Sequence, residues 1–124
     1  MADNRRVQRV EKELQHIVAK YLHRGFKGSL KGLVSVSRVV SNEKLRTAKV
    51  YVSVLGSEDD TEASLESLRE HTPDIQKHVN SQLRMKFVPR VSLHLDTSLE
   101  KVLKVESLLR EISQKKATDD GSDE

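Results

Sequence analysis

Pro73 restricts the fold of this chain most, because it stands inside a stretch whose apolar positions repeat at helical spacing. A proline within a helix removes a backbone donor and clashes with the carbonyl four residues earlier, at a cost of about 3 kcal/mol. The stripe keeps its phase across the proline, and its members are Leu65, Leu68, Thr72, Ile75, Val79 and Leu83. The pattern predicts two helices, over residues 61–71 and 73–86, joined by a kink with Thr72 as N-cap and Pro73 as the first helical residue.

The rest of the chain divides into segments with equally simple patterns. Residues 4–24 carry apolar side chains at helical spacing, which predicts a first helix. Residues 33–40 and 47–55 are rich in valine and alternate, and the short polar connection over residues 41–46 predicts an antiparallel hairpin. Residues 87–96 predict a third strand, with a proline tolerated near its start.

The first strand and the last helix have a distinct apolar face each. In the first strand, Val34, Val36 and Val40 are expected to share one face, and Arg38 intrudes on it. A last amphipathic helix is expected after Thr97. Its apolar face consists of Val102, Val105, Leu108, Leu109 and Ile112.

The order helix, strand, strand, kinked helix pair, strand, helix predicts an α+β fold, in which helices back a three-stranded sheet. The crossover through the helix pair should follow a right-handed path. This α-β-β-α-α-β order resembles the type II KH fold. We expect one domain over residues 1–112 and a disordered acidic tail over residues 113–124.

Composition removes several classes of function. The chain has no cysteine, which excludes disulfides, thiolate zinc sites and cysteine nucleophiles. It has neither the apolar core of a signal peptide nor the roughly 18 apolar residues of a membrane span. We therefore expect a soluble cytoplasmic protein with no membrane contact.

The net charge of +3 conceals an uneven distribution. The last eight residues hold four acids and no base, so the remaining chain has 22 bases against 15 acids, a net charge of +7. A basic domain of this kind favours a polyanion partner. Aromatic residues are only 3% of the chain. We therefore expect phosphate contacts, shape and a small aliphatic groove rather than an aromatic base-stacking sheet.

Four segments together resemble one family. They are "RRVQRVEKELQHIV" (5–18), "VSVSRVVSNEKLRTAKVYVSVL" (34–55), "LRMKFVPRVSLHLDTSLE" (83–100) and "VESLLREI" (105–112). In this order and spacing they look like ribosome-binding factor A. The resemblance implies a single KH-like domain without a catalytic site, which binds the rRNA of the immature small ribosomal subunit and assists its late maturation. The family's usual Ala-x-Gly kink would correspond here to His71, Thr72 and Pro73.

Eleven basic residues are the candidates for RNA contact. Arg9 and Arg84 match positions of the family pattern, and the others were chosen by charge and by their place on the predicted elements. The full set is Arg5, Arg6, Arg9, Lys27, Lys31, Arg46, Lys49, Lys77, Arg84, Lys86 and Arg90. For each one taken alone, a solvated surface position is the simpler interpretation.

Other interpretations are weaker. His71, Asp74 and His78 share a helical face, but they would have to converge on one ion across the kink without a fourth ligand, so a surface face is preferred to a zinc site. The stretch Gly25 to Gly28 is a literal GxxG, yet it lies between a helix and a strand and is better read as a helix cap and loop.

We expect no enzymatic activity, no cofactor, no metal and no small-molecule substrate, because no nucleophile motif or acid/base pair can be identified. The expected partner is the small ribosomal subunit with its rRNA, bound by a monomer. A protein-interaction adaptor that uses an edge strand or the last helix is the alternative.

Overall fold

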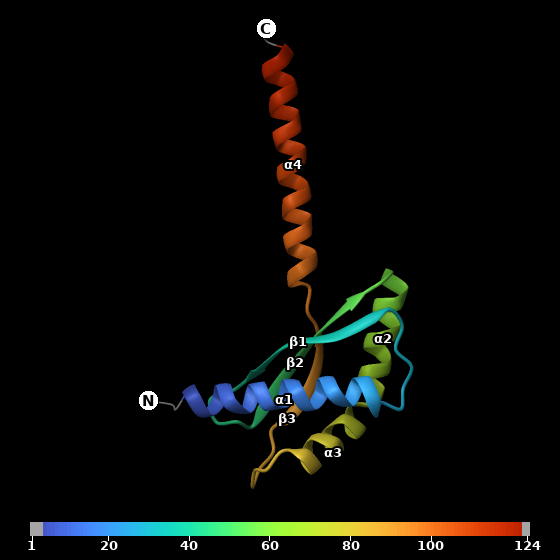
Figure 1. Cartoon of the computed structure of the whole chain (residues 1–124), viewed down its shortest axis with the longest axis vertical. Coiled ribbons are helices and arrows are strands. Elements are labelled where there is room, and N and C mark those ends of the chain that lie inside the picture. Colours follow the sequence, from blue (N-terminus) through green and yellow to red (C-terminus); the bar gives the residue numbers. More distant parts are fainter. Residues whose placement is uncertain (1–3, 123–124) are drawn as a thin grey trace.

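The computed structural model describes residues 4–122, and the predicted order of elements is confirmed (Figure 1). The elements are α1 (Asn4–Arg24), β1 (Leu33–Ser41), β2 (Thr47–Leu55), α2 (Glu58–Glu70), α3 (Thr72–Gln82), β3 (Arg90–Leu95) and α4 (Ser98–Ser122). The predicted α+β architecture of KH-like type is therefore present, and the bounds of α1 and β2 are those that the apolar periodicity indicates.

The sheet has the order β1-β2-β3, with β1 antiparallel and β3 parallel to β2. Parallel strands need a crossover connection, and here α2 and α3 form it between β2 and β3. Helices α1, α2 and α3 bury side chains against one face of this sheet. The core comprises Val10, Leu14, Val18, Val39, Leu45, Ala48, Val50, Val52, Leu68, Ile75, Val79, Leu83, Val91 and Leu93. The other face holds the alternate residues of each strand.

Strand β1 differs from its predicted pattern. A bulge between Val36 and Arg38 leaves Ser37 without a partner of its own, because Val36 pairs with Val52 and Arg38 pairs with its neighbour in β2. An extra residue in one strand reverses the alternation beyond it. Val39, at 7% exposure, is therefore the core residue, and Val40 lies on the opposite face at 43% exposure. The prediction that Val40 shares a face with Val36 was wrong.

The kink is confirmed, with different bounds and a different cap. Only His71 separates α2 from α3, and it is the N-cap residue of α3 with Pro73 in the first turn. Thr72 is not the cap, because it is already the first residue of α3, and its hydroxyl donates to the Leu68 carbonyl at 3.0 Å. Helix α2 begins earlier than predicted because Ser57 and Asp60 form a capping box. Figure 1 shows the two helices meeting at this bend.

The second half of the kinked pair is shorter than predicted, and β3 begins later. Helix α3 ends at Gln82, since Leu83 has extended backbone angles of φ −87° and ψ 120°. Residues 83–89 form a loop, and β3 starts only at Arg90 because Pro89 has no N–H to donate to the sheet. The predicted helix end at residue 86 and the predicted strand start at residue 87 were therefore wrong.

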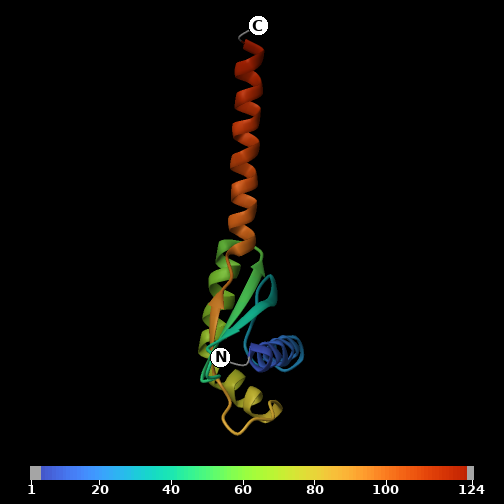
Figure 2. The ribbon, with the colours of Figure 1, turned by 90° about the vertical axis from the view of Figure 1, so that its left-hand side faces the viewer.

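Helix α4 stands away from the rest of the molecule as a single long rod (Figures 1 and 2). Its predicted apolar face is exposed, with Ile112 at 60% and Leu109 at 59%. The helix continues to Ser122, through most of the segment predicted to be a disordered tail. Residues 1–3 and 123–124 lie outside the described part, and the division at residue 112 stays a prediction. Among the helices of residues 4–122, none is long and apolar enough to cross a membrane.

Candidate functional site

A groove of about 610 Å³ lies at one end of the molecule, where three separate segments meet. The start of α1, the β1–β2 turn and the loop between α3 and β3 each contribute a wall. The lining residues are Arg6, Val7, Glu43, Lys44, Leu45, Arg46, Met85, Lys86, Phe87 and Val88. We call this feature the basic groove.

The β1–β2 turn contributes one buried residue, Leu45, and two exposed bases, Lys44 and Arg46, to the lining of the groove. Asn42 organises the turn, since its side-chain oxygen accepts from the backbone N–H of Arg46 at 2.8 Å and of Thr47 at 3.3 Å. Leu45 occupies the left-handed region with φ 55° and is buried. This unusual backbone angle for a branched side chain turns Leu45 inward, while Lys44 and Arg46 remain exposed.

The loop between α3 and β3 is held in place by Gln76 of α3. The Gln76 amide accepts from the N–H of Val91 at 2.8 Å and donates to the carbonyl of Pro89 at 3.1 Å. Both bonds join the end of the loop to the helix that follows the kink. The position of the loop therefore depends on the direction that the kink gives to α3.

Phe87 is the most exposed aromatic side chain among the described residues, at 76%. The ammonium group of Lys86 lies 5.6 Å from the centre of its ring. Met85 and Val88, on either side in the sequence, are half-buried against the core. An exposed ring next to a cation offers both a stacking surface and a charge to a ligand.

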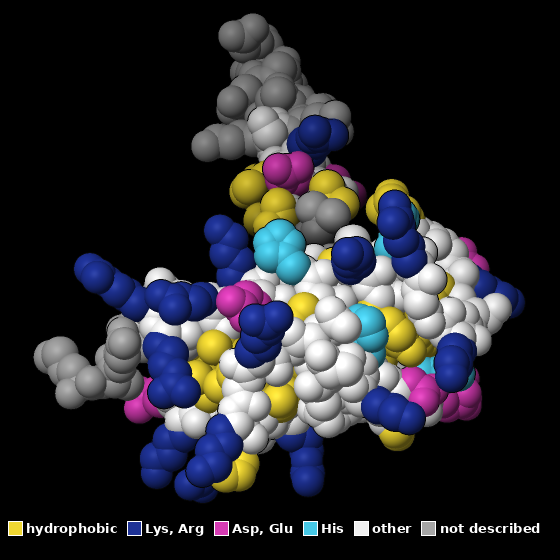
Figure 3. All heavy atoms as spheres, turned by 60° about the horizontal axis from the view of Figure 1, so that its bottom comes forward, with side chains coloured by type: hydrophobic (Ala, Val, Ile, Leu, Met, Phe, Trp, Pro, Cys, Tyr) yellow, Lys and Arg dark blue, Asp and Glu magenta, His cyan; other side chains and the backbone are white. Residues whose placement is uncertain are grey.

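The basic groove suits an anionic ligand that has an apolar part. Of its ten lining residues in the described chain, four are Lys or Arg and one is Glu. Exposed cations around a partly apolar wall attract polyanions. Figure 3 shows Lys and Arg side chains gathered most densely at the end of the molecule where α1 begins.

Three predicted RNA-contact residues, Arg6, Arg46 and Lys86, come together at the basic groove. Arg5 and Arg9 lie in the same first turns of α1, and Arg84 lies in the same loop as Lys86; all three side chains are exposed. The family-pattern residues Arg9 and Arg84 are thus near the groove but are not lining residues. Their role in binding stays a prediction.

Arg90 links the groove to the kink. Its backbone N–H donates to the Arg46 carbonyl at 2.9 Å. It also lines a second, shallower pocket of about 410 Å³ together with Thr72 and Pro73 of the kink. The third kink residue, His71, lines a different hollow, between α2 and the loop that precedes β1.

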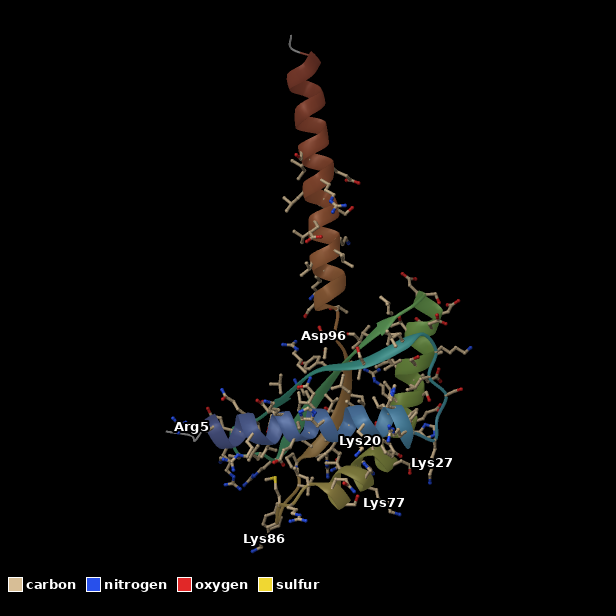
Figure 4. The ribbon with its side chains drawn as sticks, in the orientation of Figure 1. Arg5, Lys20, Lys27, Lys77, Lys86 and Asp96 are labelled. Carbon is tan, nitrogen blue, oxygen red and sulfur yellow. The ribbon has the colours of Figure 1, made fainter. Side chains whose placement is uncertain are left out.

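The remaining predicted residues do not join this site. Lys27 lies just beyond the end of α1, far from Arg5 at the start of that helix (Figure 4). Lys31 lines a hollow together with Glu66 and Glu70 of α2. Lys77 is exposed on α3, and Figure 4 shows it apart from Lys86. The eleven predicted residues therefore form more than one patch.

Lys49 belongs to the face of the sheet opposite the core. It pairs with Val40 on one side and with Ser92 on the other. Its side chain is exposed.

Aromatic packing surrounds the side of the kink that faces α1. The ring of Tyr21 stacks on His78 at 4.4 Å between centres, and Phe26 contacts His71 at 5.1 Å. The Nδ1 atom of His71 also lies 2.8 Å from the Ser67 carbonyl. Burial, followed by the charge of nearby Asp74, raises the pKa of Tyr21. The histidines considered as zinc ligands are thus part of a packed cluster. Among the side chains that the structure describes, no group of three or more His, Asp or Glu residues could hold a metal ion.

The GxxG stretch is also explained by packing. Gly25 follows the end of α1, and its N–H donates to the Tyr21 carbonyl at 2.8 Å. Gly28 lies so close to α2 that a Cβ atom there would be 2.5 Å from the Ser67 hydroxyl. The loop is therefore packed against α2, which does not suit a phosphate clamp between two helices.

Sequence reasoning did not identify Lys44, Leu45 and Phe87. Lys44 lies in the turn that was predicted correctly, so its charge could have been added to the candidate set. Phe87 was assigned to the predicted strand over residues 87–96, where its side chain would lie on one face of the sheet. Its exposure follows only from the later start of β3.

Comparison with known proteins gives consistent matches. The sequence profile of the family described as ribosome-binding factor A matches residues 6–109. Ribosome-binding factor A of Bdellovibrio bacteriovorus is 44% identical over 127 residues, which cover 100% of this chain and 95% of that protein. The protein of the same name from Geobacter sp. strain M21 is 36% identical over 117 residues, covering 94% of this chain and 96% of the relative.

Solved structures share the fold at lower identity. The crystal structure of ribosome-binding factor A from Thermus thermophilus superposes with a TM-score of 0.61 at 19% identity, over 72% of this chain and 94% of that one. A Thermotoga maritima protein solved by NMR gives 0.63 at 24% identity, over 72% and 85%. A Thermus thermophilus homology model fitted into a cryo-EM map of a complex between the 30S particle and ribosome-binding factor A gives 0.60 at 19% identity, over 72% and 93%.

Proposed function

Because this chain belongs to the ribosome-binding factor A family, we propose that it binds the immature small ribosomal subunit through its rRNA and assists late maturation without catalysing a reaction. The observation that carries the proposal is the basic groove, where cations from three segments surround a partly apolar wall. The cations would contact phosphates, and the wall would receive part of a nucleotide.

Differential binding is sufficient for this role. A factor that binds one conformation of an immature rRNA region more tightly than another increases the population of that conformation. A tenfold preference corresponds to about 1.4 kcal/mol, which a few phosphate contacts can supply. Maturation of the region would then release the factor, and no bond needs to be made or broken.

We infer a cytoplasmic protein that acts as a monomer, with no cofactor, metal or small-molecule substrate. The predicted RNA-contact set is retained as a proposal, and Arg6, Arg46 and Lys86 now come first within it. Lys44 and Phe87 are added because they line the same groove.

Salt dependence of subunit binding tests the proposal. The full chain should sediment with immature small-subunit particles at low salt and be released at high salt. If about five phosphates are neutralised at single-strand charge density, the slope of log K against log salt should be about −3.5. A slope near zero would contradict the proposed mode of binding.

Paired substitutions locate the contact. Replacing Arg46 and Lys86 together with Gln should reduce the magnitude of the slope by about 1.4, because two phosphate contacts are lost. The matched control replaces Lys20 and Arg24, two exposed bases near the far end of α1, and should leave the slope within error of the original. Equal effects of both pairs would indicate a diffuse charge effect instead of a site.

An adaptor role is the second candidate, and one observation favours it. Helix α4 exposes six large apolar side chains: Val102, Leu103, Val105, Leu108, Leu109 and Ile112. An exposed apolar helix can bind a protein partner. Association with a defined protein that persists in nuclease-treated extract, together with a flat salt dependence, would favour the adaptor over the rRNA-binding role.

A further inference from the structure

The face of the sheet opposite the core carries two aromatic rings and three basic side chains. We call it the open face, and its members are Arg38, Val40, Lys49, Tyr51, Ser53, Arg90, Ser92 and His94. Helices α1, α2 and α3 bury their apolar side chains on the opposite face. Because these helices cover the core face, the open face is the sheet surface that a ligand can reach.

The bulge in β1 places Arg38 on this face. Without the additional residue, strict alternation from Val36 would direct Arg38 toward the core side of the sheet. With the bulge, Arg38 pairs with Tyr51, and its guanidinium carbon lies 4.3 Å from the centre of the tyrosine ring. The Arg38 side chain remains 54% exposed, so part of it is accessible to a ligand.

Two rings continue this stack across the sheet. Tyr51 and His94 are paired in the register of β2 and β3, with ring centres 5.6 Å apart and planes at 36°. The Oγ atom of Ser92 lies 2.8 Å from Nε2 of His94 and fixes the orientation of the imidazole. Burial, then the charges of Lys49 and Arg69, lower the pKa of His94, which favours the neutral ring near pH 7.

The neighbours of these rings along the strands are small or cationic, apart from Asp96 just after the end of β3, whose carboxylate lies 3.7 Å from Nε of Arg38. Ser53 and Ser92 flank Tyr51 and His94 along the strands, so no bulky side chain rises between them. Lys49 and Arg90 lie further along the same strands, toward the basic groove. His94 is four residue steps along the strand from Arg90, a distance of about 13 Å. The open face thus joins the groove to the stacked rings by a row of cations.

We propose that the open face binds an unpaired segment of RNA, whose base stacks on the layer formed by Arg38, Tyr51 and His94 while its phosphates contact Lys49 and Arg90. The proposal rests on the rRNA-binding role proposed above and extends it to a second surface. Aromatic rings and guanidinium planes bind bases of single strands by stacking, and a base inside a duplex cannot reach a flat sheet. An acidic protein segment would satisfy the cations but would leave the stacked layer unused.

The first test measures binding of a short, labelled single-stranded oligouridine to the full chain by fluorescence anisotropy. Tyr51→Leu should weaken binding about tenfold, because a stacked base loses its ring partner. Tyr51→Phe keeps the ring and should stay within about twofold of the original. Arg38→Gln should weaken binding, whereas the control Arg24→Gln on α1 should not. Unfolding in urea verifies that each variant is folded.

A second test maps the contact directly and does not depend on stability. The same oligonucleotide carrying 5-iodouridine should form photochemical cross-links to the peptide that contains Tyr51 or to the one that contains His94. Cross-links confined to the basic groove, with unchanged affinity in Tyr51→Leu, would overturn this inference and leave the rRNA-binding role intact. Lost subunit binding in Tyr51→Leu with unchanged oligouridine binding would also overturn it and would indicate a protein contact. Absence of any RNA or subunit binding by the original chain would overturn both proposals.

Discussion

The hydroxyl of Ser37 lies 2.6 Å from Oδ2 of Asp96, which joins the bulge of β1 to the residue after β3 across 59 positions of the sequence. The backbone N–H of Ser98 donates to the other carboxylate oxygen at 2.9 Å, and Nε of Arg38 lies 3.7 Å from Oδ2. The hydrogen bonds from Ser37 and Ser98, with a smaller contribution from Arg38, lower the pKa of Asp96 to about 2. The charged carboxylate thus holds the bulge that positions Arg38.

This arrangement predicts a dependence of stability on pH. The pKa of Asp96 in the folded chain is below its ordinary value of 3.8, so the folded state favours the carboxylate. Its stabilising effect is complete above about pH 4 and is lost as the pH falls toward 2. Asp96→Asn should lower the free energy of unfolding by about 1–2 kcal/mol at pH 7. That difference from the original chain, measured by urea unfolding, should shrink between pH 4 and pH 2.

The control for this prediction is Glu13→Gln, which removes an exposed carboxylate on α1. Its effect on unfolding should be small at both pH values. If the loss caused by Asp96→Asn were as large at pH 2 as at pH 7, the charge of Asp96 would have no part in holding the bulge.

Ser64 makes a second long-range contact, and it is fully buried. Its hydroxyl accepts from the Lys31 N–H at 2.9 Å and donates to the Lys31 carbonyl at 2.7 Å, so it satisfies both backbone groups of one loop residue. Ser64→Ala leaves these groups without their partner and should cost about 1–3 kcal/mol in urea unfolding. Ser81→Ala removes an exposed hydroxyl on α3 and should change stability by less than about 0.5 kcal/mol. Equal losses in the two variants would contradict the importance of this contact.

Much of the fold follows from periodicity, and the exceptions have local causes. Strand β2 alternates without interruption, so its bounds and its core face could be predicted. Strand β1 alternates only as far as Val36. The extra residue at Ser37 is stabilised by Asp96, and no pattern within β1 indicates a contact so distant in sequence. The position of Arg38 within a run of valines was the only local signal, and it was interpreted as an intrusion into the core face.

The candidate sites were less predictable than the fold. Charge alone identified Arg6 and Lys86 as candidates, but their meeting at one groove depends on how α1 packs beside the α3–β3 loop. The low aromatic content argued against stacking on a sheet. That argument considered the number of rings, whereas the open face depends on where Tyr51 and His94 lie. A single pair in register across two strands is enough to form a stacking layer.

The kink at Pro73 sets the direction of α3 and so the position of the basic groove. Pro73→Ala restores a backbone donor that can reach the Arg69 carbonyl, which favours a continuous helix over α2 and α3. Ile75 and Val79 remain fully buried anchors, so the chain should stay folded with a stability change within about 1 kcal/mol. The bend should decrease, as measured by residual dipolar couplings of the two helices, and binding to immature small-subunit particles should weaken.

Thr72→Val is the matched control for the kink. It removes the hydroxyl that donates to Leu68 but keeps the proline and the shape of the side chain. Bend and particle binding should both be retained, because proline and its effect on the preceding residue remain. A reduced bend in Pro73→Ala with undiminished particle binding would show that the kink serves the packing of α3 alone. In that case Gln76, which holds the α3–β3 loop at Pro89 and Val91, would suffice to position the groove in either helix geometry.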